Sequence, residues 1–306
     1  MKLLEGFKII DLIAPFLLVT EITNKCNLRC QYCYNRNHVM KDIDLKDFKL
    51  ILKDAKQEGI FDISLSGGEP FINKQILDYI SYTQEMEFDI SIVTNGTLLS
   101  NEIAKELANL NIINDIQISF DGHTPDIHNK SRGDFHNALN GFFRLCERSE
   151  NKENSPSVGI VINKFNYYHL IDIILFFSNY TNRFHLMNVM NSDLSLADRE
   201  KNEFLTNIIP ELILLAKGKN IKLSIDMNRC SNELLDIRIN CLAGLTVLVI
   251  SANLEIYPCD IARFKLGDWK GIGSLSRAFQ KSKAIWNNLT HPWCEVGIHN
   301  DNKLSR

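Results

Sequence analysis

The chain has 306 residues, of which 45% are hydrophobic and 23% charged, and its formal net charge is −3 at pH 7. This composition is typical of a folded globular protein and excludes a disordered or collagen-like chain. The small negative charge gives no electrostatic reason to expect binding to nucleic acid or to an anionic membrane. We therefore expect neither as a partner.

The apolar segments of the chain are short. The runs 170–177 and 208–216 are interrupted by charge or proline well before the length of a bilayer span. The N-terminus contains Glu5, Lys8 and Asp11 where a secretory signal needs an unbroken apolar segment. We expect a cytoplasmic protein, whose eight cysteines act as thiols and metal ligands rather than as disulfides.

Short strand patterns alternate with helical patterns from residue 16 to about residue 225. Strands are predicted over 16–22, 61–66, 88–93, 113–120, 157–162 and 183–189, and helices over 45–59, 73–86, 100–110, 134–148, 166–178 and 198–217. Parallel neighbours require right-handed crossovers, so this order predicts a parallel sheet with helices packed outside it. Six units are too few for a closed eight-stranded barrel. We expect an α/β fold, a partial (β/α)6 TIM-like barrel over residues 1–225, with its site at the C-terminal ends of the strands.

The pattern changes after about residue 226. The run "LTVLVISANLEIYPC" predicts two short strands joined by a turn at Ser251 to Asn253, and a helix is predicted near 274–288. We expect a small second domain over residues 226–306, made of a β-hairpin and a helix.

Three cysteines follow the first predicted strand in the stretch "CNLRCQYCYN", residues 26–35. Thiolates at such short spacing are good ligands for zinc or for iron–sulfur iron. A structural zinc site normally takes four ligands supplied as two pairs, and no second pair follows at that distance. Three thiolates on a four-iron cubane leave one iron open to a small molecule. A zinc knuckle completed by a distant histidine is the alternative.

This stretch resembles the signature loop of the radical S-adenosylmethionine (SAM) enzymes, C-x3-C-x-aromatic-C, with Tyr32 at the aromatic position. The resemblance implies that Cys26, Cys30 and Cys33 hold a [4Fe-4S] cluster whose fourth iron binds SAM. Reduction by an external donor, such as a flavodoxin or a ferredoxin, would then cleave SAM to methionine and a deoxyadenosyl radical. That radical removes a hydrogen atom from the substrate.

Further segments resemble the SAM-binding strand ends of the family: "SLSGGEP" (64–70), "TNG" (94–96), "SFDG" (119–122), "KSRGDFHNALNGF" (130–142) and "VINKFN" (161–166). Paired glycines let the backbone approach a ligand closely, and a carboxylate accepts from an ammonium group. An arginine in the fourth segment would neutralise the SAM carboxylate, or would simply be solvated before a helix. The residues implied to bind SAM are Tyr32, Ser66, Gly67, Gly68, Glu69, Pro70, Thr94, Asn95, Ser119, Asp121, Arg132 and Asn163.

A second group of cysteines, Cys230, Cys241, Cys259 and Cys294, falls in the predicted second domain. The run 241–259, followed by "KLGDW" and "GSLSRAF", resembles the start of the auxiliary-cluster domain called SPASM, or of its shorter form, twitch. No cysteine follows the last of the four, so the cysteine count excludes a full SPASM domain with two auxiliary clusters. The resemblance implies one auxiliary [4Fe-4S] cluster, and the remaining Cys146 is expected in the core.

The role of Cys230 has two interpretations. It is either the ligand that completes the auxiliary site, or a free thiol that returns a hydrogen atom to a substrate radical. In the second case the auxiliary site is open or is filled by His299 or Asp301. A structural zinc site with four cysteines is a further alternative, because spacing does not identify the metal.

Relatives with such domains commonly modify ribosomally made peptides, by cross-linking, thioether formation or epimerisation, and others oxidise small sugar-like alcohols. We expect peptide modification. The alternatives are a radical SAM dehydrogenase of a small molecule and a non-catalytic zinc-binding scaffold. About fifteen residues precede the first predicted strand. These are too few for a leader-recognition domain, so we expect a separate leader-recognition protein or leader-free recognition.

Overall fold

The computed structural model describes residues 12–35, 40–110, 113–189, 193–225, 243–260 and 263–286. Seven strands in this part of the chain each pair in parallel with the next. They are β1 (Leu17–Thr23), β2 (Asp62–Gly67), β3 (Asp89–Thr94), β4 (Ile113–Ser119), β5 (Ser157–Ile162), β6 (Arg183–Asn188) and β7 (Lys222–Ile225).

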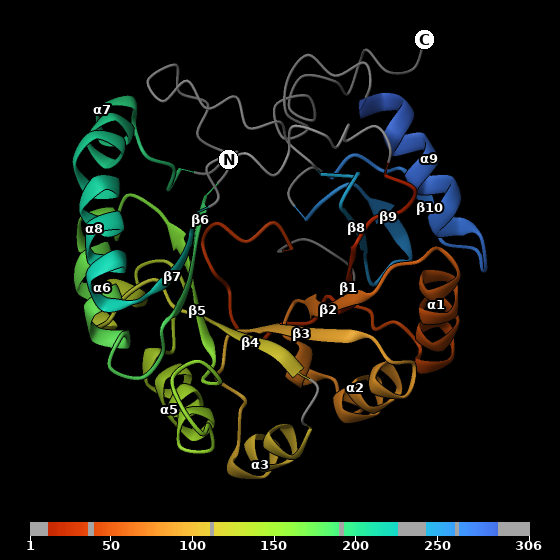
Figure 1. Cartoon of the computed structure of the whole chain (residues 1–306), viewed down its shortest axis with the longest axis horizontal. Coiled ribbons are helices and arrows are strands. Elements are labelled where there is room, and N and C mark those ends of the chain that lie inside the picture. Colours follow the sequence, from red (N-terminus) through yellow and green to blue (C-terminus); the bar gives the residue numbers. More distant parts are fainter. Residues whose placement is uncertain are drawn as a thin grey trace.

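The helices lie on the convex outer side of the curved sheet (Figure 1). They are α1 (Leu45–Gln57), α2 (Ile76–Glu85), α3 (Asn101–Asn109), α4 (Pro125–His128), α5 (Phe135–Cys146), α6 (Leu170–Phe177), α7 (Asp198–Glu203) and α8 (Ile209–Lys219). The sheet is not closed, since β7 lies at one of its edges. The predicted α/β partial barrel is confirmed.

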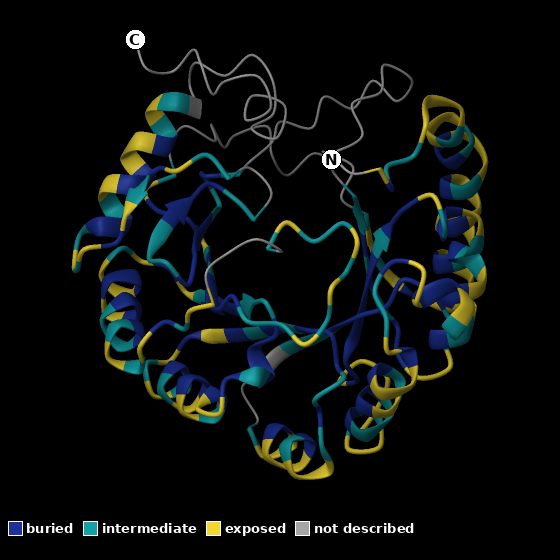
Figure 2. Cartoon of the chain, turned by 180° about the vertical axis from the view of Figure 1, so that it is seen from behind, coloured by how far each residue is buried: buried dark blue, intermediate teal, exposed yellow. Residues whose placement is uncertain are grey.

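The core lies between the sheet and its helices, where Figure 2 shows buried positions along the strands and the inner sides of the helices. Helix α1 illustrates why these residues form these elements. Its buried positions include Phe48, Ile51, Leu52 and Ala55, which recur at helical spacing. The Asp44 side chain accepts a hydrogen bond from the backbone N–H of Lys46 and so caps the start of the helix.

Two elements differ from the predicted pattern. Strand β7 is a seventh unit that the sequence did not predict, because this four-residue run carries only two apolar side chains, both half-buried at the sheet edge. The single helix predicted over 198–217 is instead α7, a π-helical turn (Phe204–Ile208) and α8. Pro210 lies in the first turn of α8. Since proline has no N–H to donate to the preceding turn, we attribute the wider turn to it.

The predicted hairpin is present as β8 (Val247–Ile250) and β9 (Glu255–Tyr257), which pair antiparallel. Strand β8 pairs in parallel with β1, and β10 (Gly267–Asp268) pairs with β9. The sheet order in the described residues is therefore β10-β9-β8-β1-β2-β3-β4-β5-β6-β7. The hairpin continues the barrel sheet beyond β1. The domain boundary expected near residue 226 falls outside the described residues and stays a prediction.

Helix α9 (Ser274–Trp286) lies beside α1 (Figure 1). The fully buried Asp54 of α1 accepts hydrogen bonds from the Trp269 indole (3.0 Å) and from the backbone N–H groups of Gly273 (2.6 Å) and Leu275 (3.2 Å). These amides lie at the start of α9, where a carboxylate is favourable. One side chain thus fastens the segment after the hairpin to the barrel. Among the described helices, none combines the length and the apolar character that crossing a bilayer requires.

Candidate active site

The three-cysteine loop follows β1 and runs into the concave side of the curved sheet (Figures 1 and 2). Cys26, Cys30 and Cys33 are free and partly exposed. Backbone N–H groups donate to the sulfurs of Cys26 (from Leu28, 3.4 Å) and Cys33 (from Asn35, 3.4 Å). Donors of this kind favour the thiolate form that a metal ion needs.

Two of these thiols, Cys26 and Cys30, resist ionisation in the absence of a metal ion. Burial raises the pKa of Cys26, and it raises the pKa of Cys30 to about 11. A metal ion must therefore displace a proton from Cys26 and from Cys30 as it binds. Within the described residues, no three His, Cys, Asp or Glu side chains lie close enough to hold a single ion. A four-iron cluster instead takes one thiolate at each of three irons, so a loop with spaced thiols fits it.

A buried carboxylate fastens this loop to the ends of the neighbouring strands. Asp121, which follows β4 and is fully buried, accepts hydrogen bonds from the hydroxyls of Tyr32 (2.6 Å) and Ser131 (2.7 Å). It also accepts one from the backbone N–H of Val161 in β5 (3.1 Å). Its charged partner is Arg132, whose Nε lies 2.9 Å from Oδ1 of Asp121. Asp121 therefore positions the cysteine loop through Tyr32. The contacts with SAM predicted for both residues stay predictions.

Arg132 is held against the same group. Its side chain is only 9% exposed, and its guanidinium lies over the Tyr32 ring, 5.4 Å from the ring centroid. Burial opposes its charge, but the Asp121 carboxylate outweighs this and raises the pKa of Arg132. The alternative of a solvated arginine is therefore wrong. Neutralisation of the SAM carboxylate by Arg132 stays a prediction.

A second buried carboxylate joins the turn after β2 to the end of β3. Glu69 accepts hydrogen bonds from the Thr94 hydroxyl (2.7 Å) and from the backbone N–H groups of Asn95 (2.8 Å) and Phe71 (3.2 Å). Burial raises the pKa of Glu69. The next residue, Pro70, begins a single 3₁₀ turn. Glu69 thus has a positioning role, and its predicted contact with the SAM ammonium group is untested.

The turn requires glycine at two positions for a steric reason that the sequence did not reveal. A Cβ atom on Gly67 would lie 2.1 Å from the carbonyl oxygen of Thr23, and one on Gly68 would lie 2.1 Å from that of Lys25. Gly67 also has a φ of 134°, which favours glycine. The turn therefore packs directly on the backbone that leads into Cys26. The sequence had explained the two glycines by ligand approach alone.

Asparagine side chains connect the end of β3 to the cysteine loop. The Asn95 amide donates to Asn27 (3.0 Å), which lies between the first two cysteines, and Asn27 donates to the Thr97 hydroxyl (2.8 Å). Sequence reasoning missed Asn27 and Thr97. The only local signal was a pair of asparagines following two predicted strands, because their contact depends on the sheet placing β1 and β3 on either side of β2.

The remaining predicted SAM contacts differ in their surroundings. Ser119 ends β4, and its hydroxyl forms no hydrogen bond within the described residues. Ser66, in β2, is half-buried. The buried Asn163 accepts from the backbone N–H of Phe165 (2.9 Å) and donates to the Val161 carbonyl (2.9 Å), so it shapes its own turn. The protein thus constrains the two serine side chains less than that of Asn163.

The auxiliary site is described only at Cys259, which follows β9 and is partly exposed. The other predicted ligands and their alternatives lie outside the described residues: Cys230, Cys241, Cys294, His299 and Asp301. Cys146 packs against the core, and burial raises its pKa to about 12, which agrees with a structural thiol.

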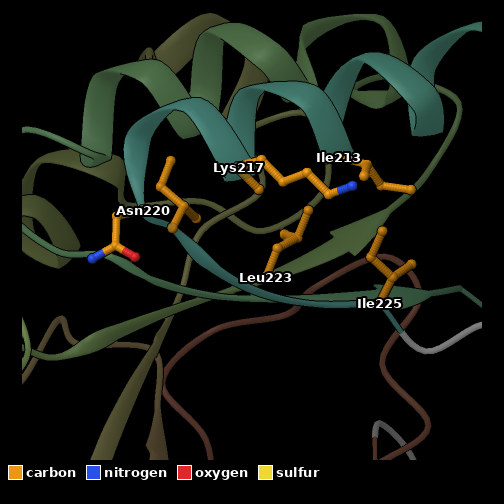
Figure 3. Close-up of a pocket in the computed structure, with 7 residues that line it drawn as sticks. Ile213, Lys217, Asn220, Leu223 and Ile225 are labelled. Atoms are coloured by element: carbon orange, nitrogen blue, oxygen red, sulfur yellow. The ribbon is translucent and has the colours of Figure 1, made fainter. Parts of the chain in front are cut away.

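A separate groove of about 270 Å³ lies between α8 and β7 (Figure 3). The side chains of Lys217, Leu223 and Ile225 are among those that line it. No residue predicted to bind SAM or iron lines it. It is therefore distinct from the candidate site.

The geometry defines a class of protein: a partial barrel of parallel strands that presents a thiol-rich loop at its strand ends. Comparison with known proteins agrees. The model of the radical SAM superfamily matches residues 20–177, about half of the chain and the part that carries the cysteine loop.

Two relatives are similar over about half of the chain or less. The PqqA peptide cyclase of Bradyrhizobium diazoefficiens is 26% identical over 163 residues, which are 52% of this chain and 42% of that protein. The probable GTP 3′,8-cyclase of Methanocaldococcus jannaschii is 33% identical over 134 residues, which are 42% of this chain and 44% of that protein. The matches thus span less than half the length of these relatives.

Solved structures show the same fold. Streptococcus suis SuiB bound to S-adenosylmethionine has a TM-score of 0.70 and 20% identity, with 90% of this chain and 66% of that chain covered. SuiB bound to the precursor peptide SuiA has a TM-score of 0.67 and 21% identity, with 94% and 67% covered.

The chain belongs to the radical SAM superfamily. The cofactors of this family are a [4Fe-4S] cluster and SAM, as the sequence predicted. The three thiols, with amide donors on two of them and an arginine nearby, fit such a group.

Proposed function

We propose that the protein binds a [4Fe-4S] cluster through Cys26, Cys30 and Cys33 and, with SAM, removes a hydrogen atom from its substrate. When bound and reduced, the cluster and SAM together supply a deoxyadenosyl radical. The observation that carries this proposal is the placement of the three thiols: one loop at the carboxyl ends of parallel strands, on the concave side of the sheet.

The chain's own residues supply position and charge. Asp121 holds the loop through Tyr32, and Glu69 holds the ends of β2 and β3 together. Arg132 brings a buried positive charge to the same strand ends, which suits an anionic carboxylate. The cofactor supplies the reactivity, and the protein orients it and excludes competing reactions.

The family match argues against the non-catalytic zinc scaffold. The experiment is anaerobic reconstitution with iron and sulfide, followed by dithionite and SAM, with deoxyadenosine measured. We expect deoxyadenosine from the wild-type protein and none from Cys30→Ala, which should keep its auxiliary iron. Cys146→Ser is the matched control, because that thiol lies on α5 outside the site. Equal deoxyadenosine from Cys30→Ala and wild type would contradict the proposal.

As the substrate we propose a ribosomally made peptide, modified by a cross-link, a thioether or an epimerisation. Support comes from the similarity to a peptide cyclase and from the fold shared with SuiB, which has been solved with a precursor peptide. An auxiliary [4Fe-4S] cluster at Cys230, Cys241, Cys259 and Cys294 belongs to this proposal. So do an external electron donor and, for leader binding, a separate recognition protein.

A small-molecule substrate is the second candidate, because the 33%-identical relative is named for a reaction of GTP. The dehydrogenation of a sugar-like alcohol is the form we expect. Incubation with peptides encoded by neighbouring genes separates the two candidates. A SAM-dependent mass change in one such peptide supports the first. Consumption of SAM in step with a ketone or aldehyde, with every peptide unchanged, supports the second.

A further inference from the structure

An ion pair between the buried Glu21 and the partly exposed Arg263 connects β1 to the segment that follows Cys259. Arg263 donates from Nη1 to Oε2 of Glu21 (3.1 Å) and from Nη2 to Oε1 of the same carboxylate. Glu21 lies in β1 and is only 3% exposed. A bidentate arginine–carboxylate pair of this kind is strong and geometrically specific. It fixes the guanidinium relative to the barrel sheet.

The same carboxylate reaches the three-cysteine loop. The hydroxyl of Tyr34, the residue after Cys33, donates a hydrogen bond to Oε1 of Glu21 (3.0 Å). The guanidinium carbon of Arg263 lies 4.3 Å from the centroid of the Tyr34 ring, which is the geometry of a cation–π contact. Tyr34 therefore contacts both partners of the ion pair.

On its other side Arg263 contacts the segment that carries Cys259. Its Nε donates to the carbonyl oxygen of Asp260 (2.9 Å), the residue after Cys259. Its guanidinium carbon lies 5.0 Å from the Tyr257 ring, two positions before that cysteine. One guanidinium thus contacts residues adjacent to two cysteines that are distant in the sequence.

We propose that Arg263 is a positioning residue that couples the three-cysteine loop to the Cys259 segment, so that the two metal-binding segments are ordered together. This inference rests on the proposed function, because it takes Cys33 and Cys259 as iron ligands. Loss of the guanidinium would leave Glu21 as an unpaired buried charge beside the loop. A cluster ligated by thiolates is itself negatively charged, so the unpaired carboxylate would oppose its binding.

The test compares Arg263→Met, Glu21→Gln and the double variant, each reconstituted anaerobically as the full chain. The readouts are bound iron and sulfide, and the EPR spectrum of the dithionite-reduced protein before and after SAM is added. We expect Arg263→Met to retain iron about tenfold more weakly, as the loss of an outer-shell partner commonly does. It should also change the spectral response to SAM, although the substitution lies in the other cysteine segment.

The double variant decides whether charge or packing matters. Glu21→Gln removes the unpaired carboxylate, so it should restore most of the iron content to Arg263→Met. Arg263→Lys keeps the positive charge but cannot form the bidentate contact. It should retain iron while altering the EPR spectrum of the reduced protein. This variant also serves if Arg263→Met fails to fold. Arg277→Met is the matched control, since that exposed arginine donates to Ser274 in α9.

The opposing outcomes are distinct. Wild-type iron content and wild-type spectra in Arg263→Met, or a double variant as defective as Arg263→Met, would overturn the coupling while leaving the proposed function standing. A wild-type protein that takes up no iron and sulfide would overturn the proposed function, and the coupling with it.

Discussion

Asp121 gathers donors from three parts of the chain around one buried carboxylate. The hydroxyl of Tyr32 comes from the cysteine loop, the backbone N–H of Val161 from β5, and the guanidinium of Arg132 from the segment after α4. The sequence predicted contacts with SAM for Asp121, Arg132 and Tyr32, and these contacts stay predictions. It did not predict that these residues would bind one another, because Tyr32 and Asp121 lie 89 positions apart.

Replacement of Asp121 by Asn should leave Arg132 as an uncompensated buried cation. Breaking one side of a buried ion pair commonly costs about 3–5 kcal/mol. We expect a loss of stability of about this size in urea unfolding, together with weaker iron retention, because Tyr32 loses its charged acceptor. Asp126→Asn removes an exposed carboxylate nearby and is the control. Equal unfolding midpoints for the two variants would show that the pair contributes no net stability.

We expect the buried His128 to make the free energy of unfolding depend on pH. Its Nδ1 accepts from the backbone N–H of Asp121 (3.3 Å), and its Nε2 lies 3.2 Å from the Gly133 carbonyl, so the neutral ring fits. Burial lowers its pKa to about 4, with Arg132 acting in the same direction. The unfolded chain has a pKa near 6.5 and therefore binds a proton first as pH falls. Stability is thus full above about pH 6.5 and declines toward pH 4.

His128→Gln tests this pH dependence, because glutamine keeps one donor and one acceptor but does not titrate. Between pH 7 and pH 5 the wild-type protein should lose about 2 kcal/mol more than the variant, since each unit of pKa difference corresponds to 1.36 kcal/mol. Urea unfolding at each pH measures the difference. Parallel stability curves for the two proteins would rule out His128 as the titrating group.

At the scale of elements, the strand ends are joined by polar side chains as well as by the sheet itself. Glu69 ties the turn after β2 to β3, Asn27 ties the cysteine loop to the residues after β3, and Asp54 ties α1 to α9. The strand and helix patterns predicted most of these elements near their observed bounds. The contacts between them depend on which strands are neighbours, which no local pattern contains.

Replacement of Asp54 by Ala should loosen α9 from the barrel. Three buried donors would lose their acceptor, and each unsatisfied group costs about 1–3 kcal/mol unless water reaches it. We expect a loss of about 3 kcal/mol or more. Amide exchange should be faster over residues 269–286 than in the wild type and unchanged in β2 to β5. Asp47→Ala, a partly exposed carboxylate on the same helix, is the control. Uniformly faster exchange throughout the chain would instead indicate global destabilisation.

At the scale of the whole molecule, the sheet is a continuous surface from β10 to β7, and the cysteine loop lies on its concave side. Strand β8 lies between β1 and β9, so only one strand separates the segment bearing Cys259 from the strand that leads into Cys26. The expectation of an appended second domain did not anticipate this shared sheet. It is the arrangement that allows Arg263 to reach Glu21.

Binding of SAM should stabilise the reconstituted protein as a whole. A ligand that binds only the folded state adds about 2.7 kcal/mol at a concentration one hundred times its Kd. We expect anaerobic thermal unfolding to shift upward on SAM addition. The shift should be lost in Cys30→Ala, which lacks a complete cluster site. The same shift in wild type and Cys30→Ala would place SAM binding outside the three-cysteine loop.

The sequence by itself determined the alternation of strands and helices, the open α/β sheet, and the three-thiol loop after the first strand. Each of these features follows from the local periodicity of apolar residues or from the spacing of cysteines. Only the tertiary structure decided that Gly67 and Gly68 pack against backbone, and that Arg263 lies between two cysteine segments. It also decided that the carboxylates of Asp121 and Glu69 accept hydrogen bonds from other protein groups. Those roles depend on groups brought together across the sheet, because a buried charge takes its partner from whatever the fold places beside it.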